Sequence, residues 1–363
     1  MAKKALIAMS GGVDSSVAAA LMCRAGYTCV GVTMKLYANE EIGISREHTC
    51  CSLSDVEDAR SVAAALGMQF FVFNFTDDFA EEVIDRFVTA YEEGRTPNPC
   101  IDCNRYMKFE KLYTRAKALG CDFIVTGHYA RVDYDAERGR WLLKKSLNTA
   151  KDQSYVLYSM TQDQLAHTQF PLGDFTDKEA VREVAEEYGF LNARKHDSQD
   201  ICFVVNGNYA DFIESYTKKH YPPGDFVDPE GNVLGRHKGL IRYTVGQRRG
   251  LGLSLKAPMY VRRKDTENNR IVLAYAKDTY ARALTATEFN WIICGDEDGD
   301  VRVTAKTRYH APEVAATARK QADGSVRLVF DEPQRAVALG QAVVLYQGEN
   351  VVGGGTISAV EEV

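Results

Sequence analysis

The sequence of 363 residues lacks any hydrophobic run that approaches the roughly 20 residues needed to span a bilayer. Near its N-terminus two lysines precede an apolar stretch of only five residues, 5–9, whereas a secretory signal needs about 7–15. Hydrophobic residues make up 45% and charged residues 26%, a balance that excludes a disordered, collagen-like or coiled-coil protein. We therefore expect a globular cytoplasmic protein of two or three domains, with no membrane partner.

A disulfide framework is also unexpected, because the nine cysteines are an odd number in a long chain without a secretion signal. Four of them lie in apolar surroundings and are expected to be buried core residues: Cys23, Cys29, Cys121 and Cys294. The adjacent Cys50 and Cys51 are less distinctive, with a core position again the favoured interpretation.

Excess charge of one sign is small overall, with a formal net charge of −6, but the basic residues are concentrated. Residues 236–282 hold 12 basic and 3 acidic side chains, and the segments 103–117 and 138–151 are also basic. Three such segments on an acidic protein indicate a docking face for a polyanion. The alternative is ordinary solvated surface.

The first 130 residues alternate between strand and helix patterns. Short apolar runs at 5–9, 29–34, 69–75 and 123–126 alternate with helical patterns at 13–25, 54–66, 79–91 and 109–119. This alternation predicts a doubly wound parallel sheet, in which ligands bind at the carboxyl ends of the strands. Strands are also expected at 140–148 and 155–160.

Turn-forming glycine and proline residues become frequent after residue 205, and short strand patterns dominate from about residue 285. The fold class is therefore α/β with a smaller central domain and a C-terminal β-barrel. The predicted domains are residues 1–205, the basic residues 206–284, and residues 285–363.

The segment 10–16, Ser-Gly-Gly-Val-Asp-Ser-Ser, joins the first predicted strand to the first predicted helix. Two glycines let the backbone approach an anion, and the helix N-terminus offers unsatisfied N–H groups and a partial positive charge. The hydroxyls of Ser10, Ser15 and Ser16 add donors. The segment predicts a phosphate or pyrophosphate site, and it lacks the Gly-Lys-Ser/Thr ending of γ-phosphate-transferring loops.

Two further cysteines, Cys100 and Cys103, follow the loop 96–99 and precede a basic helix. A position near a helix N-terminus, with Arg105 and Lys108 close by, is expected to lower a thiol pKa and favour the thiolate. Such a thiolate is a nucleophile, a persulfide carrier or a metal ligand. A four-ligand zinc site is poorly supported, because no second Cys-x-x-Cys or His pair follows.

Together these motifs resemble the tRNA-specific 2-thiouridylase (MnmA/TrmU) family of the PP-loop ATP pyrophosphatases. The resemblance is carried in order by residues 10–16, Met34, and residues 96–104, 126–131, 151–155, 198–203, 243–252, 306–309 and 353–355. It spans essentially the whole chain.

The resemblance implies ATP-dependent replacement of the C2 oxygen of a tRNA wobble uridine by sulfur, releasing AMP and pyrophosphate. It implies ATP with Mg²⁺ as cofactor, the tRNA anticodon loop and a persulfide sulfur-donor protein as partners, no DNA partner, and a disulfide bond. Cys103 would be the nucleophile and Cys202 the carrier of the incoming persulfide. The implied ATP contacts are Ala8, Met9, Ser10, Gly11, Gly12, Val13, Asp14, Ser15, Met34 and Gly127. The implied target-base contacts are Asn98, Pro99 and Cys100, and the implied tRNA contacts are His128, Lys151, Asp152, Gln153, Arg308, Tyr309 and Gln347.

One departure from the family pattern creates a second hypothesis. Many members carry aspartate where this chain has Cys100, so the carboxylate that would act as general acid or base is missing. Cys100, Cys103 and Cys202 could instead hold a [4Fe–4S] cluster that binds sulfide on an open iron. Persulfide transfer and cluster-bound sulfide therefore remain alternatives.

An adenylated intermediate must be shielded from water, so segments 38–49 and 98–104 are expected to close over it. Two other functions compete with thiolation. A PP-loop ligase for a small acid would have no use for the basic segment 236–282. A non-catalytic RNA-binding protein with a structural metal at Cys100 and Cys103 would bind tRNA without releasing pyrophosphate from ATP.

Overall fold

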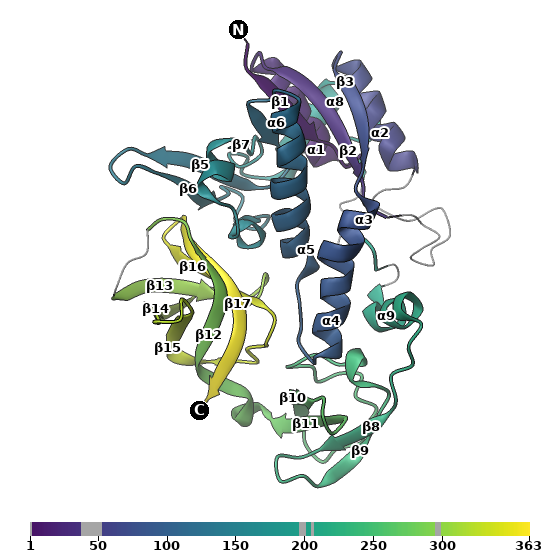
Figure 1. The fold of residues 1–363 in the computed structure, drawn as a ribbon, viewed down its shortest axis with the longest axis vertical. Helices are drawn as coiled ribbons and strands as arrows, with labels where there is room; N and C mark the ends of the chain where they lie inside the picture. The colour runs from purple at the N-terminus through teal and green to yellow at the C-terminus, as the bar shows by residue number, and fades with distance from the viewer. Residues whose placement is uncertain (1, 38–52, 196–200, 205–206, 295–298) are drawn as a thin grey trace. The chain divides into compact units, whose positions relative to one another are not determined.

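The computed structural model describes residues 2–37, 53–195, 201–204, 207–294 and 299–363 (Figure 1). The chain forms two compact units, and each takes segments from distant parts of the sequence. The first unit consists of Met1–Ile84, Cys100–Gly207 and Gly348–Val351. The second consists of Asp85–Pro99, Asn208–Gln347 and Val352–Val363.

A parallel five-stranded sheet is the centre of the first unit, as the alternating pattern predicts. Its strand order is β3-β2-β1-β4-β7, and every neighbouring pair is parallel. The strands are β1 (Lys4–Ala8), β2 (Thr28–Lys35), β3 (Gln69–Asn74), β4 (Phe123–Val125) and β7 (Thr168–Gln169). Outside this sheet, β5 (Ala130–Asp135) and β6 (Arg140–Lys145) form an antiparallel hairpin, and Lys144 of β6 pairs with Asn350.

Helices fill the connections between these strands. They are α1 (Val13–Arg24), α2 (Leu53–Ala65), α3 (Thr76–Phe79), η1 (Ala80–Asp85), α5 (Pro99–Asp102), η2 (Cys103–Leu112), α6 (Tyr113–Ala118), η3 (Ser154–Leu157), α7 (Gln162–Ala166) and α8 (Lys178–Glu187). The expected strand at 155–160 is wrong, because residues 154–157 form a buried 3₁₀ turn.

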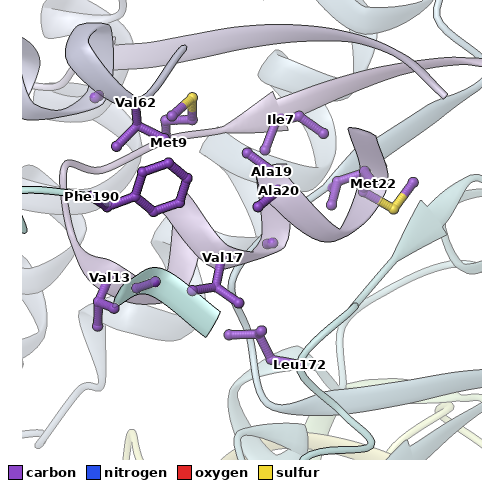
Figure 2. Packing of buried hydrophobic residues seen from close by; sticks show 14 of the residues in the cluster. Ile7, Met9, Val13, Val17, Ala19, Ala20, Met22, Val62, Leu172 and Phe190 are labelled. Atoms are coloured by element: carbon purple, nitrogen blue, oxygen red, sulfur yellow. The ribbon is translucent and has the colours of Figure 1, made fainter. Parts of the chain in front are cut away.

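Small side chains on α1 let this helix lie close to the sheet. Ala19 and Ala20 of α1 are completely buried and pack in one cluster with Ile7 of β1 (Figure 2). Val62 of α2 and Phe190, which follows α8, join the same cluster. Because interiors are close-packed, enlarging such an alanine typically costs about 1–3 kcal/mol. This packing fixes the start of α1 relative to the end of β1.

The second unit contains a central sheet and a closed barrel. The central sheet has the order β10-β11-β8-β9, with β8 (Gly224–Val227), β9 (Val233–His237), β10 (Met259–Asp265) and β11 (Arg270–Tyr275). The barrel is formed by β12 (Tyr280–Trp291), β13 (Asp300–Lys306), β14 (Val314–Lys320), β15 (Val326–Arg335), β16 (Ala342–Gln347) and β17 (Asn350–Glu362). Pairing of β12 with β17 closes it and removes the exposed sheet edges, which confirms the predicted barrel.

The helices of the second unit are α4 (Arg86–Glu92), α9 (Tyr209–Thr217), η5 (Leu240–Arg242) and η6 (Ala276–Thr279). Tyr91 of α4 contacts Tyr209 of α9, with ring centroids 4.9 Å apart. The ammonium nitrogen of Lys264 lies 5.2 Å from the centroid of the Tyr91 ring. That nitrogen is buried and has no hydrogen-bond partner among the described residues, and burial lowers the pKa of Lys264 to about 8.

Replacing Lys264 by methionine is expected to stabilise the second unit at pH 7. Because the pKa falls from 10.5 to about 8, keeping Lys264 charged lowers the free energy of unfolding by about 3 kcal/mol. The contact of the ammonium group with the Tyr91 ring offsets roughly 1 kcal/mol of this loss. The methionine variant should therefore have a free energy of unfolding about 2 kcal/mol higher than that of the wild type below pH 8. This difference declines between pH 8 and pH 10.5, because the folded wild type then holds a neutral amine.

Urea unfolding of the whole chain at pH 7 and at pH 10 measures this difference. Lys277→Met, at an exposed position, is the control and should change stability little at either pH. A gain that is equal at both pH values would mean that the charge of Lys264 is not the cause.

Candidate active site

The loop between β1 and α1 has the geometry of an anion cradle. Gly11 has a φ of +76°, and a Cβ atom there would lie 2.3 Å from the carbonyl oxygen of Asp55. Gly12 is the N-cap of α1 and has no side chain that could cap the first turn. The first backbone N–H groups of a helix have no partner within the helix, so this turn can bind an anion.

Hydrogen bonds of the serine hydroxyls stabilise this loop. Ser15 and Ser16 each donate from Oγ to the carbonyl oxygen of Gly12 over 3.0 Å, and the N–H of Ser10 donates to Oγ of Ser15 over 3.2 Å. The sequence interpretation treated these hydroxyls as donors to the anion. The structure gives the hydroxyls of Ser15 and Ser16 a different role, because they already donate to the loop's own backbone.

Side chains that are distant in the sequence also form hydrogen bonds to this loop. Asn192 donates from Nδ2 to the Gly11 carbonyl oxygen over 3.0 Å and to Ser16 Oγ over 2.9 Å. Lys195 lies 2.7 Å from Asp55 and 2.6 Å from Asp58, and it also donates to the Gly11 carbonyl oxygen. Burial lowers the pKa of Lys195, but the two carboxylates outweigh it and raise the pKa, so the cation is stable.

Asp14 is held by two partners that sequence reasoning missed. Nζ of Lys178, at the start of α8, lies 2.7 and 2.8 Å from the two carboxylate oxygens, and the hydroxyl of Tyr129 donates over 2.7 Å. Gly127, which follows β4, packs so tightly that a Cβ would lie 2.8 Å from the Ser15 nitrogen. These contacts fix the end of β4 against the loop.

The predicted ATP contacts lie at the carboxyl ends of three neighbouring strands. Ala8 ends β1 and Met9 follows it, Met34 lies near the end of β2, and Gly127 follows β4. The N–H of Met9 donates to the carbonyl of Val32 over 2.8 Å, which joins the two strand ends. The structure therefore brings these residues together with the loop, at the edge where parallel sheets bind ligands.

The helix that carries Cys103 begins earlier than expected. Pro99 is the first residue of α5, a position that suits proline because its missing N–H would be unpaired there. Residues 99–104, which belong to the segment 98–104 expected to close over the intermediate, are therefore helical and not a loop. Cys100 is exposed and Cys103 is partly exposed.

The thiol of Cys103 does not have the lowered pKa that the sequence indicated. Burial raises its pKa, and the charge of Lys108 offsets only part of this effect. The carboxylate of the adjacent Asp102 adds to the rise, so burial and Asp102 together outweigh the basic neighbour that the sequence pointed to. Cys103 therefore needs a base or a bound substrate to become a thiolate.

Cys202 belongs to the same unit as Cys103 and is partly exposed. Its carbonyl oxygen accepts a 2.9 Å hydrogen bond from the hydroxyl of Tyr37. The adjacent Phe203 is buried against Phe79 of α3, with ring centroids 5.8 Å apart. Within the described parts of the chain, Cys23, Cys29, Cys103 and Cys121 take part in no disulfide.

The cluster hypothesis finds no support in this arrangement. Among the described residues, which include Cys100, Cys103 and Cys202, no three His, Cys, Asp or Glu side chains are grouped to hold a metal ion. Three thiolates gathered around one iron–sulfur cluster would require such a group. The predicted ligand set for a [4Fe–4S] cluster is therefore not assembled.

The predicted tRNA contacts of the first unit have clear roles within the protein. His128 is buried, contacts Phe109 and Phe170, and shares a 2.7 Å hydrogen bond with Thr126. Burial and the neighbouring Lys108 hold the pKa of His128 well below its usual value, so the ring stays neutral.

The segment after β6 is similarly organised by its own side chains. Asp152 accepts from the N–H of Ser146 over 3.0 Å and from the hydroxyl of Ser154 over 2.8 Å. Gln153 accepts from the N–H of Tyr129 over 2.9 Å. Lys151, beside them, is partly exposed, as are Asp152 and Gln153.

The other predicted contacts belong to the second unit. Arg308 donates to the carbonyl oxygens of Val245 and Ala336 over 3.0 and 2.6 Å, and Gln347 donates to that of Arg302 over 2.9 Å. Tyr309 packs against His310. Asn98 and Pro99 follow Thr96, whose N–H donates to the barrel residue Leu339 over 2.9 Å.

Several predictions fall on residues that the structure does not describe. They are the closing segment 38–49, the pair Cys50 and Cys51, and the motif residues 198–200. Across the described parts of the chain, every helix is too short or too polar to cross a membrane.

Comparison with known proteins identifies the family. The tRNA methyl transferase HUP domain matches residues 3–206, the tRNA methyl transferase PRC-barrel domain residues 210–275, and the aminomethyltransferase beta-barrel domain residues 281–357. The tRNA-specific 2-thiouridylase MnmA of Moorella thermoacetica is 52% identical over 99% of this chain and 100% of its own length. Those of Clostridioides difficile and Acetivibrio thermocellus are 48% and 52% identical over 98% of this chain, and 98% and 99% of their own lengths. The chain therefore belongs to the tRNA-specific 2-thiouridylase (MnmA) family.

Proposed function

We propose that this chain catalyses the ATP-dependent replacement of the C2 oxygen of a tRNA wobble uridine by sulfur. The observation that carries the proposal is the anion cradle of Gly11, Gly12 and the N-terminus of α1, at the carboxyl edge of the sheet. Both candidate sulfur-handling residues, Cys103 and Cys202, lie in the unit that contains this cradle. Family membership supports the same reaction.

The cradle would hold the phosphates of ATP during adenylation. The C2 oxygen attacks the α-phosphorus, a bond to AMP forms, and pyrophosphate leaves into the first turn of α1. The preorganised N–H groups stabilise the charge that develops on the leaving group. Mg²⁺ would enter with ATP as part of the substrate, bound mainly by phosphate oxygens and water.

Sulfur transfer then follows in three steps. The donor protein's persulfide transfers its outer sulfur to the Cys202 thiolate and leaves as a thiolate. The Cys202 persulfide attacks C2, and AMP leaves with the former C2 oxygen. The Cys103 thiolate attacks the inner sulfur of Cys202, which leaves sulfur on C2 and a disulfide between the two cysteines. A reductant must then restore both thiols, which fits a cytoplasmic setting.

The wobble uridine must leave its stack to reach this site, and an anticodon loop makes that easier than a duplex does. We propose that Asn98, Pro99 and Cys100 line the base and that the remaining family positions contact tRNA. These are His128, Lys151, Asp152 and Gln153 of the first unit and Arg308, Tyr309 and Gln347 of the second. Arg308 would act indirectly, because its guanidinium donates to the carbonyl oxygen of Val245 and so positions that loop.

Incubation with ATP, sodium sulfide and an anticodon-loop tRNA tests the proposal. Release of pyrophosphate that depends on tRNA, together with 2-thiouridine in the digested nucleosides, is the expected result. Binding of tRNA without release of pyrophosphate would instead indicate a non-catalytic RNA-binding protein.

Cys100→Ser separates the two sulfur routes. The persulfide route needs only Cys103 and Cys202, so we expect this variant to keep at least about a third of wild-type activity with a persulfide donor. Nucleoside analysis of treated tRNA measures it. If the variant is as inactive as Cys103→Ser and anaerobically prepared protein loses a brown absorbance, the persulfide route is wrong.

A further inference from the structure

A largely apolar strand, partly exposed, forms one edge of the parallel sheet. β3 is the terminal strand in the order β3-β2-β1-β4-β7, and in Figure 1 it is drawn beyond β2. Phe71 and Val72 of β3 are each 42% exposed, and Phe70 and Phe73 are partly exposed. We call these four residues the aromatic edge.

This edge has none of the usual protection against association. Natural edge strands carry charged residues, proline or bulges, which discourage pairing with other chains. The sequence of β3 is Gln-Phe-Phe-Val-Phe-Asn, without a charge or a proline, and its pairing with β2 is regular. Phe71 and Phe73 stack on one face of the strand, and contiguous exposed apolar surface of a folded protein commonly marks an interaction site.

The aromatic edge is continuous with the surroundings of Cys202. Phe71 stacks on Phe73 with centroids 6.4 Å apart, and Phe73 contacts Phe75 at 6.2 Å. The carbonyl of Phe75 accepts from the N–H of Phe79, and Phe79 contacts Phe203, which adjoins Cys202. Phe75, Phe79 and Phe203 are buried, so these contacts run through the interior. Tyr37, two residues beyond the end of β2, also donates from its hydroxyl to the carbonyl oxygen of Cys202 over 2.9 Å. A partner seated at the carboxyl end of the aromatic edge would therefore lie close to the part of the fold that holds Cys202.

Acidic residues border the aromatic edge. The chain continues from β3 into α3 and η1, which carry Asp77, Asp78, Glu81 and Glu82. Asp77 and Glu81 are exposed and lie one helical turn apart, whereas Asp78 pairs with Lys111 over 2.7 Å. We call these four residues the acidic rim. Negative charge here repels a polyanion such as tRNA and attracts a basic protein.

We propose that the aromatic edge and the acidic rim form the docking surface for the persulfide-carrying sulfur-donor protein. The inference rests on the proposed function, because only that reaction requires a donor to reach Cys202. The donor would present an apolar side chain and basic residues beside its persulfide cysteine. Its persulfide then transfers the outer sulfur to the Cys202 thiolate, and the donor cysteine leaves as a thiolate.

Comparison of two sulfur sources tests this surface. A cysteine desulfurase from the same organism, supplied with L-cysteine, must dock, whereas sodium sulfide diffuses freely. For Phe71→Ser we expect kcat/KM for the desulfurase to fall at least tenfold, with the sulfide-dependent rate within twofold of wild type. Asp77→Lys combined with Glu81→Lys should act in the same direction and more strongly at low salt.

A matched control is Tyr134→Ser, on the hairpin strand β5, where the side chain is 51% exposed. It should change neither rate. Unchanged desulfurase-dependent rates in both test variants would overturn the proposal. If Phe71→Ser lowers both rates equally, its fold is damaged and the charge-reversal variant decides.

Two other outcomes would also assign the surface differently. If wild type is a dimer by light scattering and Phe71→Ser is a monomer, the aromatic edge is covered by a second copy of the chain. If the desulfurase-dependent loss is matched by loss of tRNA binding, the surface serves tRNA. Wild type that forms no 2-thiouridine from either source would instead contradict the proposed function itself.

Discussion

Cys202→Ser is expected to lower desulfurase-dependent 2-thiouridine formation by about 1000-fold or more, because loss of a covalent nucleophile usually costs at least that much. A serine hydroxyl cannot carry a sulfane sulfur. Cys103→Ser should cause a similar loss, since nothing then releases the sulfur from Cys202. Pyrophosphate release should persist in both variants, because adenylation uses the cradle and not the thiols. Nucleoside analysis and pyrophosphate assays on the same samples measure both steps.

Millimolar sodium sulfide should restore part of the product in Cys202→Ser, since sulfide can attack the adenylated C2 directly. Cys294→Ser is the control, because Cys294 lies in the second unit outside the proposed chemistry. Full desulfurase-dependent activity in either Cys103→Ser or Cys202→Ser would contradict the proposed route of sulfur.

Gly11→Ala is expected to lower tRNA-dependent pyrophosphate release by at least about 100-fold. The new Cβ would lie 2.3 Å from the backbone oxygen of Asp55, so either the loop or α2 must move. A positive φ adds strain of about 1 kcal/mol for any residue with a Cβ. Because misplacement of about 1 Å can cost 100-fold in rate, the displaced N–H groups should no longer stabilise the leaving pyrophosphate.

Gly26→Ala provides the matched control at the other end of α1. Gly26 also has a positive φ, of +83°, but a Cβ there meets nothing within 4 Å. This variant should lose about 1 kcal/mol of stability and keep its rate of pyrophosphate release. If the two variants are equally active, the tight approach of Gly11 to Asp55 is not needed for catalysis.

Local patterns were sufficient to predict the cradle. Its glycines, the strand before it and the helix after it are contiguous in residues 4–24, so one segment contains all of the information. The parallel sheet and the barrel also follow from periodicity and turn residues. The expected strand at 155–160 failed because its β-branched and aromatic residues are buried by tertiary contacts in a 3₁₀ turn, and burial overrode local propensity.

The side chains that hold the cradle in place could not be predicted from local sequence patterns. Asn192, Lys195 and Lys178 contact the loop across more than 160 residues of sequence, and no spacing rule links them to it. The early start of the Cys103 helix had a signal that was overlooked, namely Pro99 in a favourable first-turn position. The wrong pKa direction for Cys103 has a different cause, because desolvation of the thiol by the surrounding protein raises the pKa and local sequence does not show that burial.

The interleaved segments of the two units have a consequence for synthesis on the ribosome. Helix α4 belongs to the second unit, yet its partners Tyr209 and Lys264 come more than 100 residues later. At about 5–20 residues per second, the nascent helix waits several seconds or longer for them. Its apolar face stays open to chaperones meanwhile, and neither unit can be exchanged between proteins as one uninterrupted stretch of gene.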